Sequence, residues 1–252
     1  MKKIISSLLL SLLSLVAIAG TGSEELWDRG NRLYVSGDYN GAIATYDSIV
    51  NSGLESAPLY YNLAGAYFKA GKNGKAILNY HRAERLDPSN EDIAHNLAYA
   101  EARVVDKIES VPGSAVGRWF DSIARLFSAD SWGVVSLVML GVALASLLFY
   151  LLSERRRVRK LGFFAGLVAL VCLVLSVTFG LTARSEQLND TEAIVLSTAS
   201  SVKASPEKSG KDLFILHEGT KVEVLDSFGD WTEIRIADGK EGWILSSAIE
   251  VI

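Results

Sequence analysis

The chain has 252 residues and a formal net charge of −4 at pH 7, and 49% of its residues are hydrophobic. An acidic chain lacks the basic footprint that nucleic-acid phosphates require, which excludes nucleic acid as a partner. Its single cysteine, Cys172, excludes an intrachain disulfide, and no metal-ligand spacing stands out, so we expect no metal and no cofactor. The composition changes sharply along the chain, which predicts several domains.

The first 19 residues have the order of a secretory signal peptide. Lys2 and Lys3 precede an apolar stretch over residues 4–19, which ends in Ala17-Ile18-Ala19, an A-x-A cleavage pattern. The alternative is an uncleaved anchor. Either outcome places the chain from residue 24 onward outside the cytoplasm.

Residues 23–109 contain a helical repeat with a period of 34 residues. Gly37, Ala42 and Tyr46 return as Gly71, Ala76 and Tyr80. This period is the signature of the tetratricopeptide repeat, a helix–turn–helix unit. We predict repeats over 23–56 and 57–90, followed by a capping helix over 91–109 that covers the apolar side of the second repeat.

The repeat pattern assigns the inner face of the curved stack to the first helix of each repeat. Its predicted members, called the aromatic face below, are Trp27, Asn31, Tyr34, Tyr61, Phe68, His95, Tyr99 and Arg103. We interpret this face as a groove for an extended peptide or a partner helix. The alternative is that several of its aromatic rings only pack between helices.

Residues 114–131 follow a helix-breaking Pro-Gly pair and place Trp119, Phe120, Ile123 and Phe127 at helical spacing. Large aromatic residues on one side, directly before a long apolar run, predict an amphipathic helix. This helix would lie in the lipid–water interface on the non-cytoplasmic side of the membrane. Packing of this helix onto the repeats is the alternative.

Residues 133–152 and 161–183 form two uncharged apolar runs of 20 and 23 residues. About 20 helical residues span a bilayer core of about 30 Å, so a transmembrane hairpin is predicted. The loop between the runs, residues 153–160, has a single acid, Glu154, and five basic residues: Arg155, Arg156, Arg157, Arg159 and Lys160. Basic loops stay in the cytoplasm, so both flanking parts are expected on the other side of an inner membrane, facing the periplasm.

From residue 193 to 252 the hydrophobic period changes to two, with turns at Gly219, Gly229 and Gly239. The order Val222-Glu223-Val224, Trp231, Asp238-Gly239 and Gly242-Trp243-Ile244 resembles a bacterial SH3 domain, a small all-β barrel. That resemblance implies binding of proteins or cell-wall peptides. Candidate surface residues are Phe228, Trp231 and Trp243. Both tryptophans could instead belong to the core.

The expected fold is thus multidomain, with all-α tetratricopeptide repeats, a two-helix transmembrane hairpin and a small all-β SH3-like barrel. This arrangement resembles the BatE-like proteins of the Bacteroides aerotolerance family. The resemblance rests on residues 92–97, 105–109, 119–122 and 159–164. It implies a membrane complex containing von Willebrand A-domain proteins and a MoxR-type ATPase, and a role in oxygen or stress tolerance.

Two functions remain open at this stage. The first is a non-enzymatic scaffold, anchored in the lipid bilayer, that binds protein partners through both folded parts. The second is a sensor or adaptor that binds peptidoglycan through the SH3-like part. We expect no enzymatic activity, because the chain contains no P-loop, no G-x-S-x-G and no H-E-x-x-H motif.

Overall fold

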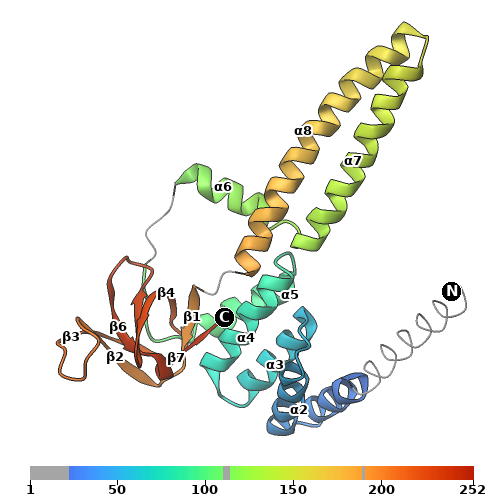
Figure 1. Cartoon of the computed structure of the whole chain (residues 1–252). Coiled ribbons are helices and arrows are strands. Elements are labelled where there is room, and N and C mark those ends of the chain that lie inside the picture. The colour runs from blue at the N-terminus through green and yellow to red at the C-terminus, as the bar shows by residue number, and fades with distance from the viewer. Residues whose placement is uncertain (1–22, 110–113, 189–190) are drawn as a thin grey trace, which may run out of the picture.

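The computed structural model describes residues 23–109, 114–188 and 191–252, so the predicted signal peptide lies outside the described residues. A stack of helices lies beside a β-sheet module, and a long helical hairpin projects from both (Figure 1). We call residues 23–109 the repeat module and residues 191–252 the β module.

The repeat module consists of antiparallel helices with the predicted spacing. Residues 23–35 form a helix that is followed by α2 (Tyr39–Asn51), α3 (Ala57–Lys69), α4 (Asn73–Leu86) and α5 (Glu91–Glu101). Capping side chains start α2 and α5, because Asp38 accepts a hydrogen bond from the Gly41 N–H and Asn90 accepts from the Ile93 N–H. Small residues let the helices approach, and Ala42, Ala64 and Ala76 are fully buried among them.

The capping helix is shorter than predicted, since α5 ends at Glu101 rather than near residue 109. The following segment leaves the helix because the β module binds it. The Val104 side chain is buried in the same core as Ile77, and Asp106 accepts three hydrogen bonds from the β module. These contacts outweigh the helix propensity of the segment.

A short helix and two long helices follow: α6 (Ala115–Ala124), α7 (Ala129–Leu152) and α8 (Arg156–Gln187). The predicted helix over 114–131 is therefore divided, because Ser128 accepts from the Ser131 N–H and caps the start of α7. The apolar run 133–152 covers α7 except for its first turn, and the run 161–183 covers the central part of α8. The predicted loop over 153–160 narrows to residues 153–155, and the arginines from Arg156 onward are helical, as their propensity permits.

Helices α7 and α8 are long and apolar enough to cross a membrane, and their side chains are mostly exposed. They pack along their length, with the Ser136 and Ser176 hydroxyls 2.9 Å apart. A Cβ on Gly162 would lie 2.9 Å from the Ser146 carbonyl oxygen, so this glycine lets the backbones meet. A Cβ on Gly141, on the same helix as Ser146, would meet nothing within 4 Å.

The β module is one bent antiparallel sheet with the strand order β3-β2-β6-β5-β4-β1-β7. Its strands are β1 (Glu192–Val195), β2 (Ala199–Lys203), β3 (Asp212–His217), β4 (Lys221–Phe228), β5 (Trp231–Arg235), β6 (Glu241–Leu245) and β7 (Ile249–Val251), with a short 3-10 turn η1 (Ser246–Ala248). Register shifts at Val202/Lys203 and Val224/Asp226 bend the sheet around its own core.

The repeat module and the β module share a hydrophobic core. Ile194 of β1 and Ile252 are buried in the same cluster as Ile77 and Leu78 of α4. Helix α4 is consequently buried on both sides, by the other repeat helices and by the β module (Figure 1). The two modules therefore form one folded body next to the hairpin.

Candidate functional site

The residues of the aromatic face lie on the first helix, on α3, and on α5 with the turn that follows it. The Asn31 Oδ1 accepts hydrogen bonds from the Tyr46 hydroxyl (2.7 Å) and from the Asn62 Nδ2 (3.0 Å), which ties the first helix to α2 and α3. The Asn96 Nδ2 donates to the Tyr61 hydroxyl at 2.8 Å, which ties α3 to α5. These bonds fix the helices that carry the predicted groove residues.

The end of the row nearest α5 is the most exposed. The Arg103 guanidinium lies 4.5 Å from the Phe68 ring centroid and 5.1 Å from that of Tyr99, and it donates a hydrogen bond to the Tyr99 hydroxyl. Tyr99 is 54% exposed. Stacked aromatic rings with an exposed edge and a cation offer a surface for apolar and acidic groups of a peptide.

Several of the predicted groove residues also pack internally. Trp27 is half-buried against the Tyr46 ring and lines a cavity of about 260 Å³ at the start of the stack, beside Leu54 and Leu59. Tyr34 stacks edge-on against Tyr39. His95 is exposed on α5. The structure thus brings Phe68, Tyr99 and Arg103 into one surface, whereas Trp27 lies at the far end of the row.

The predicted surface of the β module divides into exposed and buried residues. Phe228 is 66% exposed, and Trp243 is half-buried. Trp231 is buried at 8% exposure and pairs with Phe228 across the β4–β5 hairpin and with Leu245 on β6, so its assignment to the surface was wrong.

The hydrogen bonds and ion pairs between the two modules, among the described residues, fall on α4 and on the segment after α5. The Glu218 carboxylate accepts from the Gly74 backbone N–H at 2.7 Å. Glu250 pairs with both Lys75 and Arg82. Except for Arg103, which lies in the segment after α5, the aromatic face belongs to other helices, and the bonds of Glu218, Glu250 and Asp106 do not involve its side chains.

Asp106 is the central polar residue of this contact. Its carboxylate accepts from the backbone N–H of His217 (2.7 Å) and from the Thr220 hydroxyl (2.6 Å), and it lies 2.7 Å from the His217 Nδ1. Burial tends to raise the pKa of Asp106, but the hydrogen bonds from Thr220 and His217 outweigh it and lower the pKa. The charged carboxylate is therefore the form that holds the contact.

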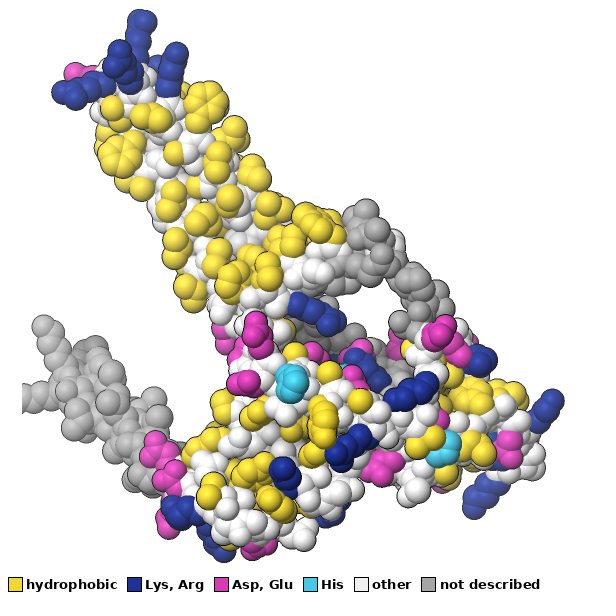
Figure 2. All heavy atoms as spheres, turned by 180° about the vertical axis from the view of Figure 1, so that it is seen from behind, with side chains coloured by type: hydrophobic (Ala, Val, Ile, Leu, Met, Phe, Trp, Pro, Cys, Tyr) yellow, Lys and Arg dark blue, Asp and Glu magenta, His cyan; other side chains and the backbone are white. Residues whose placement is uncertain are grey.

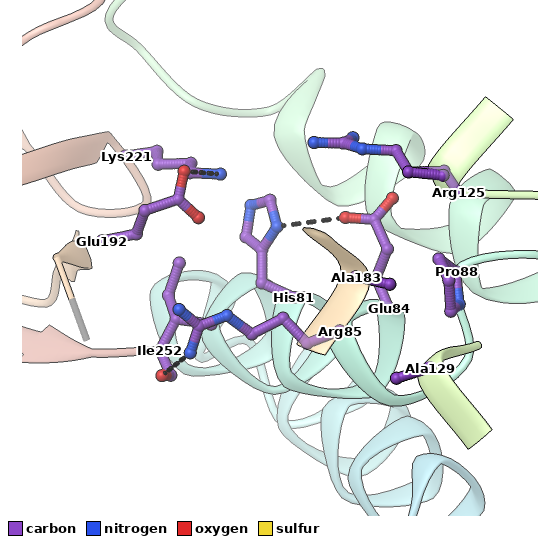
Figure 3. Close-up of a pocket in the computed structure, with 11 residues that line it drawn as sticks. His81, Glu84, Arg85, Pro88, Arg125, Ala129, Ala183, Glu192, Lys221 and Ile252 are labelled. Carbon is purple, nitrogen blue, oxygen red and sulfur yellow. Dashed lines mark hydrogen bonds and ion pairs between the residues drawn. The ribbon is translucent and has the colours of Figure 1, made fainter. Parts of the chain in front are cut away.

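A cavity of about 270 Å³, called the foot cavity, lies where the repeat module, the β module and the hairpin meet (Figure 3). It is lined by His81, Glu84, Arg85, Pro88, Ala124, Arg125, Ala129, Ala183, Glu192, Lys221 and Ile252. Each of the three parts supplies a wall. Lys221 and Glu192 form an ion pair of 2.8 Å on the β-module side.

His81 lies at the buried side of the foot cavity, with its side chain 8% exposed. Its Nδ1 is 3.5 Å from a Glu84 oxygen, and its Nε2 is 3.3 Å from a Glu101 oxygen but outside hydrogen-bonding geometry. Burial opposes charging of the ring, but the two carboxylates outweigh it and raise the pKa of His81. In turn, His81 lowers the pKa of Glu84, against the effect of burial.

The five basic residues predicted to set the topology gather at the tip of the hairpin, at the end opposite the two folded modules (Figure 2). Arg155 lies in the short loop, and Arg156, Arg157, Arg159 and Lys160 lie in the first turns of α8, all exposed. At the other end, α6 packs on the hairpin. The Phe120 ring lies 5.8 Å from Phe179 of α8, rather than against the repeats.

Within residues 23–109, 114–188 and 191–252, no three His, Cys, Asp or Glu side chains gather as a metal site would need. Cys172 is exposed on α8.

Comparison with known families supports the division into modules. The model of the TPR repeat family matches residues 64–103, and the model of the bacterial SH3 domain matches residues 198–250. The predicted fold is confirmed: helical repeats, two apolar helices and an SH3-like β module. Each match covers less than half of the chain, and no curated protein matches it.

Sequence reasoning missed the residues that join the modules, among them Asp106, Glu218 and Glu250. One signal was available in α4. Leu78 and Gly74 lie on the side of α4 that a terminal repeat would expose to solvent, and a large aliphatic residue there indicates a covering partner. Nothing in the local pattern identified that partner as the β module.

Proposed function

We propose that this chain is a non-enzymatic scaffold in the bacterial inner membrane. It holds protein partners at the periplasmic surface through the aromatic face and the β module. The observation that carries the proposal is the docking of the β module on α4, which leaves the Phe68, Tyr99 and Arg103 surface of the repeats available. A rigid pair of recognition modules fixed to one anchor holds two ligands at a constant spacing.

The proposed topology rests on charge. The basic tip of the hairpin remains in the cytoplasm, and both modules lie outside it. Cysteines introduced at Gly229, Lys72 and Arg157, in a chain with Cys172→Ala, test this in intact cells with a maleimide that cannot cross the inner membrane. Labelling at positions 72 and 229 but not at 157 is expected. Labelling at 157 alone refutes the topology.

The partners follow from the resemblance to the BatE-like proteins. They would be von Willebrand A-domain membrane proteins with an associated MoxR-type ATPase, acting in oxygen or stress tolerance. Because the repeats and the β module share a core, deleting the repeats would expose Ile194 and Ile252. Point substitutions on the surface are the better test.

The test is recovery of partners from detergent extracts with a tagged full-length chain. The double substitution Tyr99→Ala with Arg103→Ala removes the exposed edge of the aromatic face without touching the α4 contact. We expect recovery of partners to fall about tenfold or more, as for a central aromatic–arginine pair in an interface. Lys240→Ala, on an exposed turn of the β module, is the control. Unchanged recovery in the double variant would refute the scaffold.

A second candidate is a cell-wall adaptor, favoured by the exposed Phe228 and the half-buried Trp243 of the SH3-like β module. Flat aromatic rings at a surface suit stacking on sugar rings and peptides. Co-sedimentation of the detergent-solubilised full chain with purified sacculi measures this function. Phe228→Ala should abolish sedimentation if the adaptor is correct, whereas Tyr99→Ala with Arg103→Ala should leave sedimentation unchanged.

A further inference from the structure

The sheet of the β module ends in two edge strands, and α4 contacts one of them. At one end of the strand order lies β7, where Arg82 of α4 donates to the Val251 carbonyl oxygen and pairs with Glu250. At the other end lies β3, on the side of the β module away from the repeats (Figure 1). Among the described residues, only β2 pairs with β3, so one edge of β3 is open.

The open edge presents backbone hydrogen-bonding groups. In an antiparallel pair, the N–H and C=O of one residue both face the partner strand or both face away, and the direction alternates along the strand. The His217 N–H faces away from β2, because it donates to the Asp106 Oδ2 at 2.7 Å. Ile215 lies two residues earlier in the same register, opposite Ser201 of β2. Ile215 therefore directs its N–H and C=O to the open edge.

Exposed apolar side chains lie along the same strand. Leu213 is 46% exposed and Ile215 is 55% exposed, whereas Leu216 is buried in the core of the β module. Natural proteins commonly protect an edge strand with lysine or proline, which discourage pairing with another chain. Strand β3 contains neither, and its one acid, Asp212, is paired with Lys203 at 2.8 Å. The strand is therefore suited to accept another strand.

Two lysines lie at the beginning of this edge. Lys211 directly precedes β3 and Lys208 lies in the turn before it, and both are exposed. Neither forms an ion pair or a side-chain hydrogen bond with any residue in the described parts of the chain, whereas the neighbouring Glu207 accepts a hydrogen bond from Ser205. A second copy of β3 would add two more cations to the contact, but acidic residues of a different protein would complement the lysines.

We propose that β3 binds an extended segment of a partner protein as an added antiparallel strand. The backbone of that segment pairs with the N–H and C=O of Ile215, and its apolar side chains lie beside Leu213 and Ile215. Acidic residues at its C-terminal end lie beside Lys208 and Lys211, because an antiparallel strand ends where β3 begins. The proposal names the contact of the β module in the scaffold, and it rests on the proposed function for the existence of a protein partner.

The first test uses the unsubstituted full-length chain in detergent and a fluorescent probe peptide, with binding followed by fluorescence anisotropy. The probe has about eight residues, with valine and threonine in alternation and two aspartates at the C-terminal end. We expect saturable binding with a dissociation constant below about 1 mM. A peptide of the same composition with the aspartates at the N-terminal end should bind more weakly. No saturation up to about 1 mM, or equal binding of both peptides, overturns the proposal.

Methylation of the peptide backbone distinguishes strand addition from contacts of side chains alone. Two further probes carry N-methyl groups on alternate residues, one on the odd positions and one on the even positions. Successive N–H groups of a strand face opposite sides, so only one of these probes loses the donors that face β3. We expect that probe to bind about tenfold or more weakly than the other. Equal affinity of the two overturns the proposal.

Substitution of Ile215 locates the binding on β3. Ile215→Pro removes the N–H that faces the open edge and leaves the hydrogen bonds to β2 in place, which is the position where an edge strand tolerates proline. Binding of the probe should weaken about tenfold or more. Ile215→Val keeps the donor and should bind like the unsubstituted chain. Equal binding by all three chains overturns the proposal. If the proline variant unfolds, the methylated probes still decide, since they need no substitution.

Tyr99→Ala with Arg103→Ala separates this surface from the aromatic face. The double variant should bind the probe as the unsubstituted chain does, because the contacts of both residues lie within the repeat module. Loss of probe binding in this variant would assign the probe to the aromatic face and overturn the proposal. If the same variant binds the probe and also recovers its partners normally, the aromatic face is refuted as a partner site and binding at β3 stands.

Discussion

Asp106 joins the segment after α5 to the β module through three contacts of one carboxylate. Asp106→Asn keeps the size of the side chain but removes its charge. We expect the free energy of unfolding of the full chain to fall by about 1–3 kcal/mol, because a buried donor loses a charged acceptor. Chemical unfolding in detergent, followed by tryptophan fluorescence, measures this. Asp238→Asn, on an exposed turn, is the matched control and should leave the unfolding curve in place.

The Asp106 carboxylate also predicts that the free energy of unfolding falls in acid. The pKa of Asp106 is lowered in the folded chain, so its contribution is present above the unfolded pKa and lost as the pH falls through the folded pKa. The difference in stability between the unsubstituted chain and Asp106→Asn should therefore shrink below about pH 4. A difference that stays constant into strong acid would contradict this account.

His81 predicts the opposite dependence, a loss of stability as the pH rises. Its pKa is raised when folded, so its stabilising contribution is complete below the unfolded value of 6.5 and disappears as the pH rises through the folded pKa. Glu84, whose pKa is lowered, requires a pH above its unfolded value of 4.5. The pair therefore contributes fully between these two values. Melting temperatures of the unsubstituted chain and His81→Gln should differ more at about pH 6 than at about pH 9. An equal difference in melting temperature at the two pH values would show that the His81 ring contributes only by packing.

At the scale of the element, the hairpin depends on one glycine of α8. A Cβ at position 162 would lie 2.9 Å from the Ser146 carbonyl oxygen and 3.0 Å from the Tyr150 nitrogen, both backbone atoms that cannot rotate away. Gly162→Ala should separate the two helices and lower the stability of the hairpin by about 1–3 kcal/mol. Unfolding by sodium dodecyl sulfate, followed by circular dichroism, measures this.

Gly141→Ala provides the control for that experiment, because the added methyl group would meet nothing within 4 Å. It replaces glycine by the best helix former and should leave the hairpin unchanged or slightly more stable. If both substitutions had the same effect, the close approach at Gly162 would not hold the hairpin together.

The elements also show how far local patterns reach. The 34-residue period located the repeat helices, since each repeat has its own turn glycine and small packing residues. The predicted length of the capping helix was wrong. Val104 and Asp106 lie outside the helix because they contact β-module residues more than 100 positions later in the chain. The apolar runs located both long helices and the end of α7 at Leu152, but not the start of α7 or the ends of α8. The basic segment before the second run is helical as well, although it lies outside that run.

At the scale of the whole molecule, docking of the β module depends on the turn before β4. Gly219 has a φ of +91°, and a Cβ there would lie 2.9 Å from both the Ile77 Cδ1 and the Val104 Cγ2. Gly219→Ala should destabilise the chain through strained backbone and through separation of the modules. Gly239→Ala shares the backbone strain, at φ +88°, but meets nothing within 4 Å.

The difference between these two variants isolates the docking contact. We expect Gly219→Ala to lose about 1–3 kcal/mol more than Gly239→Ala, the usual cost of overpacking a filled core. Urea unfolding of both variants gives the comparison. Faster hydrogen exchange at β1 and α4 should accompany the larger loss. Equal losses would mean that the close contact at Gly219 does not stabilise the docking of the β module.

The sequence by itself determined the three kinds of module, because helical period, apolar length and strand alternation are properties of neighbouring residues. Only the tertiary structure decided how the modules are joined. Burial of Trp231, docking of Glu218 and Glu250 on α4, and the foot cavity all depend on residues distant in the chain. The local sequence does not identify these residues, because a glutamate on a free surface and a glutamate that contacts another module have the same local pattern.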